Sequence, residues 1–195
     1  MLDWERIDRW TAAIAVGDIA AIAATFAQHG AAAPGLAWNP VPERFDADSL
    51  RFLTSHWHGL ARPGELPHFK QIDPLALRPA LGYIMLLDLI EDGRDFRYRL
   101  YGSMIASVSG FDMTGKLLSE HPASPYVTEF AMAGYRAAAL RREPVFTERH
   151  PVGALRATRW QRVALPLVDD SGTIVRFLAG TAPIASDGRT LRAAY

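Results

Sequence analysis

The chain has 195 residues, a length that supports one sizeable hydrophobic core but not two ordinary domains and a linker. It carries 21 basic and 21 acidic residues, so its formal net charge is zero with histidine neutral. A neutral chain has no global attraction to nucleic acid or to anionic membranes, and neither partner is expected. Cysteine is absent, which excludes disulfides, thiol nucleophiles and cysteine-ligated metal sites.

The first 64 residues predict a helical extension. Apolar residues recur every three to four positions over 1–30, which is typical of amphipathic helices, and Gly17 separates two of them. Residues 31–45 are rich in proline and predict a loop. A third amphipathic helix is predicted over 50–60. The extension therefore consists of three helices and a connecting loop.

The N-terminus does not look like a targeting segment. Asp3, Glu5 and Asp8 stand where a signal peptide needs a cationic region. The most apolar stretch, 11–27, is rich in alanine and is interrupted at Gly17, so it does not predict a membrane span. A cytoplasmic protein is expected.

From residue 65 onward the pattern changes from helices to strands. The predicted regular elements are one long helix and five strands, namely helix 126–142 and strands 83–89, 96–101, 145–150, 160–168 and 174–182. Helices interrupt the strands only after the second, which is not the alternation of a parallel α/β fold. We predict an antiparallel α+β domain over 65–185, followed by a tail over 186–195.

Two of the predicted strands, 83–89 and 174–182, are apolar on both faces, so both faces of the sheet need a cover. The long helix 126–142 provides one cover. The amphipathic N-terminal helix, or alternatively a second subunit, is expected to provide the other.

The predicted strands also suggest a partner-binding surface. If Phe96 and Tyr98 face inward, the alternating residues of that strand point to the opposite face. Arginine and aromatic residues of the later strands join them, and such residues anchor many interfaces. The predicted surface consists of Arg97, Arg99, Tyr101, Trp160, Arg162 and Arg176. The alternative is that the acidic N-terminal helix packs on this stripe and pairs with it.

No metal site is predicted from the histidines. His56 and His58 lie two residues apart on a predicted helix, where side chains point in nearly opposite directions and cannot share one ion. None of the common catalytic motifs of metalloproteases, hydrolases or dinucleotide-binding enzymes is present.

The second half resembles a PAS-like family of short bacterial proteins. The matching signals are IDP at 72–74, DFRYRLYG at 95–102, DMTGK at 112–116 and LPL at 165–167. The resemblance covers about 65–185 and implies a five-stranded antiparallel sheet whose second and third strands are separated by helices. It also implies a small cavity between the sheet and those helices, and an N-terminal helix that mediates dimers.

The resemblance further implies a sensory or interaction module. We predict a non-catalytic sensor or adaptor that binds a small ligand, forms a homodimer and contacts a signalling protein. Because no output domain follows Ala182 in this sequence, the signal is expected to leave through protein–protein contact. The predicted cavity-lining residues are Tyr98, Leu100, Met104, Val108, Met113, Phe130, Gly134, Phe146, Val163 and Leu165.

The sequence does not identify a cofactor. Haem-binding PAS domains place an axial histidine on the long helix, whereas helix 126–142 has none and His121 only precedes it. Flavin photosensors of this fold use a cysteine, which is absent. Two alternatives to the sensor stay open. One is an enzyme that uses His121, His150 or a tyrosine as acid or base, and the other is a purely structural homodimer.

Overall fold

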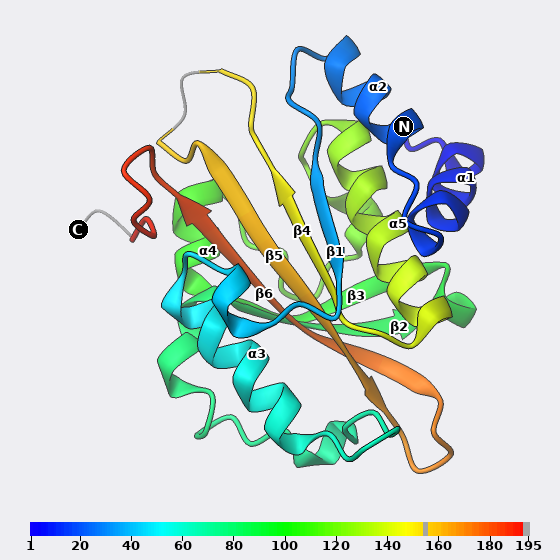
Figure 1. Cartoon of the computed structure of the whole chain (residues 1–195), viewed down its shortest axis with the longest axis vertical. Helices are drawn as coiled ribbons and strands as arrows, with labels where there is room; N and C mark the ends of the chain where they lie inside the picture. The colour runs from blue at the N-terminus through cyan, green and yellow to red at the C-terminus, as the bar shows by residue number, and fades with distance from the viewer. Residues whose placement is uncertain (154–155, 193–195) are drawn as a thin grey trace.

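The computed structural model describes residues 1–153 and 156–192, and Figure 1 shows the arrangement of their elements. They form one six-stranded antiparallel sheet with the strand order β1-β4-β5-β6-β2-β3. The strands are β1 Gly35–Trp38, β2 Ile84–Ile90, β3 Asp95–Tyr101, β4 Val145–Arg149, β5 Arg159–Val168 and β6 Ile174–Ile184. The α-helices are α1 Trp4–Ala15, α2 Ala20–Gln28, α3 Asp48–Leu60, α4 Ser103–Ser109 and α5 Pro125–Arg141.

The predicted α+β fold is confirmed, with one strand more than expected. The five predicted strands are β2 to β6, and the helices α4 and α5 lie between β3 and β4. The additional strand β1 lies in the segment predicted as a loop and pairs with β4, with Ala37 opposite Phe146. A four-residue edge strand is too short for a period-two pattern to stand out between the prolines at 34 and 40.

Helix α3 covers one face of the sheet. Its buried residues Leu50, Leu53 and Trp57 pack on the central strands, and the Trp57 Nε1 donates a hydrogen bond to the carbonyl oxygen of Pro166 at 3.0 Å. Gly180 on β6 permits the close approach. A Cβ there would lie 2.5 Å from Leu50 Cδ2 and 2.8 Å from Leu53 Cδ2. The predicted third helix is therefore the second cover of the sheet.

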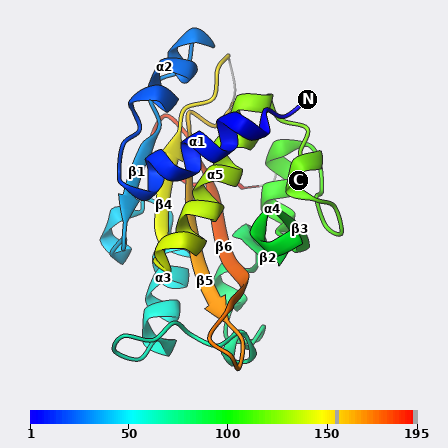
Figure 2. The same cartoon turned by 90° about the vertical axis from the view of Figure 1, so that its right-hand side faces the viewer.

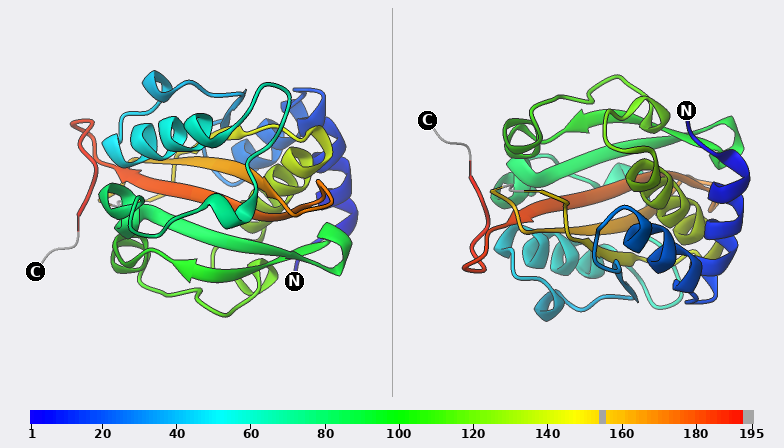
Figure 3. Two further views of the ribbon diagram at one scale, coloured as in Figure 1. Left: turned by 90° about the horizontal axis from the view of Figure 1, so that it is seen from below. Right: turned by 90° about the horizontal axis from the view of Figure 1, so that it is seen from above.

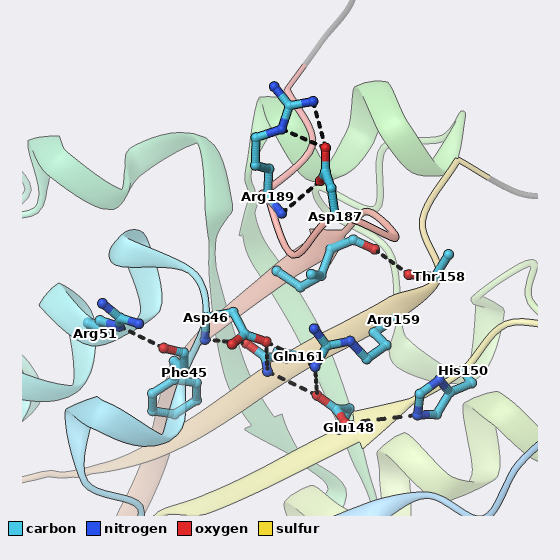
Figure 4. Close-up of polar contacts among 11 residues, drawn as sticks. Phe45, Asp46, Arg51, Glu148, His150, Thr158, Arg159, Gln161, Asp187 and Arg189 are labelled. Carbon is cyan, nitrogen blue, oxygen red and sulfur yellow. Dashed lines mark hydrogen bonds and ion pairs between the residues drawn. The ribbon is translucent and has the colours of Figure 1, made fainter.

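A partly buried polar network attaches the segment before α3 to the sheet (Figure 4). The Gln161 side chain is only 2% exposed, and its Nε2 donates to Asp46 Oδ2 at 3.0 Å and to Glu148 Oε2 at 2.9 Å. Its Oε1 accepts from the Asp46 backbone at 2.9 Å. Arg159 Nη1 completes the network with contacts to Asp46 at 2.9 Å and to Glu148 at 3.3 Å. The start of α3 is thereby fixed beside β4 and β5.

Helix α5 covers the opposite face of the sheet, and α1 lies on the outer side of α5 (Figure 2). The expectation that the N-terminal helix covers the sheet directly is therefore wrong. The apolar stripe of α1 meets alanine-rich positions on the outer side of α5, where Trp10 and Ile14 pack with Ala133 and Ala137. Figure 3 shows that α1 and the turn at 185–190 lie at opposite ends of the molecule.

Ion pairs fix α1 on α5. Arg6 Nε lies 2.7 Å from Glu129 Oε2, and the Glu129 side chain is completely buried. Asp8 Oδ1 lies 2.8 Å from Arg136 Nη2. Of the acidic residues near the N-terminus, Asp8 thus pairs with α5, Glu5 lies 3.8 Å from Arg9 of its own helix, and Asp3 caps α1 by accepting from the Arg6 backbone. The alternative in which they pair with an arginine stripe on the sheet is wrong.

A β-bulge in β3 reverses the faces of its last residues. Leu86 of β2 pairs with Leu100, whereas the next residue, Leu87, pairs with Tyr98, so Arg99 is the extra residue. Before the bulge, Tyr98 faces α5. After the bulge, Leu100 packs in the core under α3 and Tyr101 packs under α5. Simple alternation along this strand therefore fails at its end.

Candidate functional site

Two arginine side chains lie on the sheet face that α5 covers. Arg149 ends β4 and lies opposite Trp160, and Arg162 of β5 lies opposite Thr147. In an antiparallel pair this register makes the two arginines diagonal neighbours on one face, with Cβ atoms roughly 7–8 Å apart. We call Arg149 and Arg162 the arginine pair.

Neither member of the arginine pair forms an ion pair with a carboxylate of residues 1–153 or 156–192. Arg162 Nε donates to Thr181 Oγ1 at 3.2 Å, and its guanidinium lies 5.8 Å from the centre of the Tyr135 ring. The Arg149 guanidinium lies 5.5 Å from the centre of the Trp160 ring. By contrast, Arg159 and Arg176 on the opposite face each contact a carboxylate.

The arginine pair makes this region electropositive. Burial, and to a smaller extent repulsion from Arg162, lowers the pKa of Arg149 to about 10. Burial, followed by the charges of both arginines, lowers the pKa of His121 to about 3. The His121 ring packs edge-on against Phe111 at 4.9 Å between centres, and Nδ1 accepts from the backbone of Ala123 at 3.2 Å. The histidine is therefore neutral near pH 7 and adds no third charge.

A buried tyrosine faces the same region with an unused hydroxyl. Tyr135 of α5 is 1% exposed, and its Oη has no hydrogen-bond partner among the described residues. Burial raises the pKa of Tyr135, and burial also raises those of Tyr98 and Tyr101, so these phenols stay protonated. Buried polar groups are nearly always hydrogen-bonded in proteins, so an orphaned hydroxyl marks a place where a ligand or water can bind.

Two small cavities lie between α5 and the sheet, each of about 10 Å³. Phe130, Thr147 and Arg162 line both of them. Gly134 and Tyr135 line only the first, and the second is lined also by Val127, Arg149, Trp160 and Thr181. Each volume is about that needed for one water molecule. A larger ligand therefore requires the shared side chains to move and join the two cavities.

Larger hollows occur at the surface, and each of them has acidic as well as basic side chains in its lining. A hollow of about 400 Å³ between α1 and the β2–β3 turn includes the ion pair of Asp8 and Arg136. One of about 670 Å³ beside the turn at 185–190 includes Arg189, which pairs with Asp187. The region between α5 and the sheet differs because no acidic side chain lines either of its two cavities.

The ten predicted cavity-lining residues do not surround one cavity. Tyr98 and Met113 pack in the core under α5, and Phe130 and Gly134 belong to α5 and line the cavities. The other side of the sheet, in the core under α3, holds Leu100, Phe146, Val163 and Leu165. Met104 and Val108 are half-buried on α4. The prediction selected apolar strand residues, whereas the α5 side of β4 and β5 near the cavities carries threonine and arginine.

The predicted partner-binding stripe is also divided between the two faces, so its description as one surface is wrong. Tyr101, Trp160 and Arg162 lie on the α5 side, and Tyr101 is only 8% exposed. On the α3 side, Asp88 is paired with Arg99 and Arg176, both at 2.6 Å, and lies opposite Arg97. The bulge at Arg99 moves Tyr101 to the other face, and Arg162 and Arg176 sit on opposite faces by strand register.

Sequence reasoning missed Tyr135 and Arg149 as ligand-facing groups, and it named His121 only as a possible acid or base. The signal for Arg149 was its position in β4, where alternation places it on the same face as Val145 and Thr147 and on the opposite face from the acidic Glu148. His150, the other candidate acid or base, lies away from the site, with Nε2 3.9 Å from Glu148 Oε1 (Figure 4). Residues 1–153 and 156–192 contain no cluster of metal-ligating side chains.

Comparisons with known proteins identify a family for most of this fold. A family model described as the PAS domain matches residues 45–180, which is more than half of the chain and runs from just before α3 into β6. Neither the curated proteins nor the solved structures include a significant match. In the described part of the chain, no helix is both long and apolar enough to cross a membrane.

Proposed function

Because this chain belongs to the PAS domain family, whose members are generally sensory modules, we propose that it is a non-catalytic cytoplasmic sensor that binds a small ligand between α5 and the sheet. The observation that carries this proposal is a set of polar groups there whose bonding is incomplete. The arginine pair has no acidic partner among the described residues, and Tyr135 has a buried, unbonded hydroxyl. A region built only for packing would satisfy or omit such groups.

Helix α5 supplies a path from the ligand to the surface. Its inner side lines the two cavities, and its outer side holds α1 through the buried carboxylate of Glu129. Glu129 Oε1 accepts from Arg6 Nη2 and from the backbone of Asp3, both at 2.9 Å. Phe130 directly follows Glu129 in α5, so a ligand that displaces Phe130 also disturbs the Glu129 carboxylate. We therefore propose that ligand binding changes how α1 packs on α5, and that a protein partner reads this change.

The proposed partner is a signalling protein or a second copy of the chain. The side of α1 that faces away from α5 is exposed and carries Glu5 and Arg9, which lie 3.8 Å apart. Sedimentation of the full chain over a range of concentrations separates a monomeric sensor from a dimer. A dimer whose association changes with ligand favours the second copy as the partner.

The test is a thermal-unfolding screen of the purified protein against a panel of metabolites, followed by hydrogen exchange. A ligand that binds only the folded state raises the melting temperature. With that ligand, we expect amide protection to change in α5 and α1, whereas α3 on the opposite face stays unchanged. A complete panel without any stabilising compound, together with no small molecule released from the purified protein, would contradict the proposal.

A further inference from the structure

We infer that the ligand is a small organic acid whose carboxylate is held by Arg149 and Arg162, an inference that rests on the proposed ligand site between α5 and the sheet. The two arginines are diagonal neighbours on one sheet face, so their guanidinium groups can approach one anion. Arginine presents a planar fork of donors that matches a carboxylate bidentately.

The charge balance of the region favours an anion over other ligands. Two cations share a half-buried region that contains no acidic partner among residues 1–153 and 156–192. A metal ion would add to their repulsion, and a neutral ligand would leave both charges uncompensated and further desolvated. An anion forms charge-assisted hydrogen bonds with both guanidinium groups and removes their mutual repulsion.

The remaining groups of the region suit the rest of such a ligand. Tyr135 has a hydroxyl with no partner, and Thr181 already bonds the Arg162 guanidinium at 3.2 Å and so orients it. Phe130, Val127 and Trp160 supply apolar surface beside the arginines. This combination of a cationic end, one unused donor and an apolar wall fits a carboxylate that is attached to a compact apolar group.

The cavities show where this ligand would enter. Both border Phe130 and Arg162, and each holds about 10 Å³, so the Phe130 ring must move before an organic acid fits. The next residue of α5, Ala131, packs in the core between α5 and the sheet. The preceding residue, Glu129, accepts a hydrogen bond from Arg6 of α1. Entry of the acid is thereby coupled to the outer contact of α5.

The experiment compares acids with their neutral amides of nearly the same shape. Benzoate and succinate are titrated against benzamide and succinamide by calorimetry and by thermal unfolding. We expect the carboxylates to bind and the amides to bind at least tenfold more weakly. The variants Arg149→Gln and Arg162→Gln should each lose at least tenfold in carboxylate affinity. Arg149→Lys keeps the charge but lacks the forked donors of arginine. Its carboxylate affinity should lie between that of the unchanged chain and that of Arg149→Gln.

The matched control is Arg97→Gln, the same change at an exposed arginine on the other face of the sheet. This variant should bind the acids like the unchanged chain, and circular dichroism checks that each variant is folded. Equal binding of acids and amides, or acid binding that survives both glutamine variants, would overturn the inference while leaving a ligand site in place. If neither acids, amides nor other metabolites bind, the proposed ligand site itself is wrong.

Discussion

Gly134→Ala should stabilise the protein and weaken ligand binding at the same time. Gly134 lies in the middle of α5 and lines the cavity shared with Phe130 and Arg162. A Cβ added there would have its nearest neighbour, Thr147 Cγ2, at 4.0 Å, which is ordinary contact without a clash. Alanine in a helix interior is favoured over glycine by about 1 kcal/mol. The new methyl group also fills interior space, which adds roughly 0.5–1 kcal/mol.

The sum is a stabilisation of about 1.5–2 kcal/mol, or a rise in melting temperature of roughly 3–8 °C for a chain of this size. Because the methyl group enters a cavity of only about 10 Å³, it removes space that the ligand needs. Any compound that stabilises the unchanged protein should therefore stabilise the variant less. Chemical denaturation measures the first effect, and the ligand-dependent shift in melting temperature measures the second.

The control is Gly59→Ala in α3, where an added Cβ meets nothing within 4 Å. This change acts on helix propensity in the same direction, with a smaller effect because Gly59 lies in the last turn of α3. It does not touch the cavity, so it should leave the ligand-dependent shift intact. A Gly134→Ala protein that is less stable than the unchanged chain would refute the description of the cavity. One that is more stable but binds ligand normally would place the ligand elsewhere.

Further predictions concern charge and packing. Because burial and repulsion lower the pKa of Arg149 more than two pH units below its ordinary value, on the order of 3 kcal/mol opposes its charge. After allowance for solvent and for the lost contact with Trp160, Arg149→Gln should stabilise the ligand-free protein by about 1 kcal/mol, whereas a drop in melting temperature would contradict this. The folded-state pKa of His121, about 3, lies below its ordinary 6.5. Its contribution to stability is therefore complete above pH 6.5 and is lost as the pH falls toward 3. His121→Phe should reduce the decline of the free energy of unfolding with falling pH by up to about 1.4 kcal/mol per pH unit. Urea unfolding between pH 5 and 7 measures this slope, and an unchanged slope would count against a buried neutral histidine. Glu129→Gln should lower the free energy of unfolding by about 2 kcal/mol, because it breaks the ion pair between Arg6 and the buried Glu129. Hydrogen exchange should show faster exchange of the α1 amides, and unchanged exchange would indicate that apolar contacts alone hold α1. Gly180→Ala should cost about 1–3 kcal/mol in chemical denaturation, since its methyl group meets two leucines of α3 at 2.8 Å or less; a neutral effect would show that α3 moves freely.

The periodicity of the sequence located most elements, because burial of one face imposes a local pattern on the residues. It did not determine what each face contacts. The stripe of α1 indicated a buried face, but packing on a sheet and packing on α5 require the same apolar residues. The distinction lies in pairs far apart in the sequence, such as Arg6 with Glu129. A charge on α1 is equally compatible with a partner on any element until the fold is known.

The faces of β3 show a second limit of local reasoning. Alternation assigns Leu100 to the side of Tyr98, and the bulge at Arg99 moves it to the opposite side. Nothing in the run from 95 to 101 marks that bulge, because arginine at an exposed strand position is ordinary. One extra residue thus exchanges the faces of every later residue in the strand. The predicted ligand and partner residues were divided wrongly for this reason and because apolar strand residues were assigned to the cavity.

The site itself is recognisable only from what the arginine pair lacks. A count of 21 acidic against 21 basic residues suggests that every charge has a partner. The structure shows that the carboxylates are distributed unevenly: Asp88 contacts two arginines, and Glu148 and Asp46 share Arg159. The α5 side of the sheet is left with two cations and an unbonded tyrosine hydroxyl. Because an uncompensated, half-buried charge costs stability, such an arrangement is best explained by an external anion that completes it.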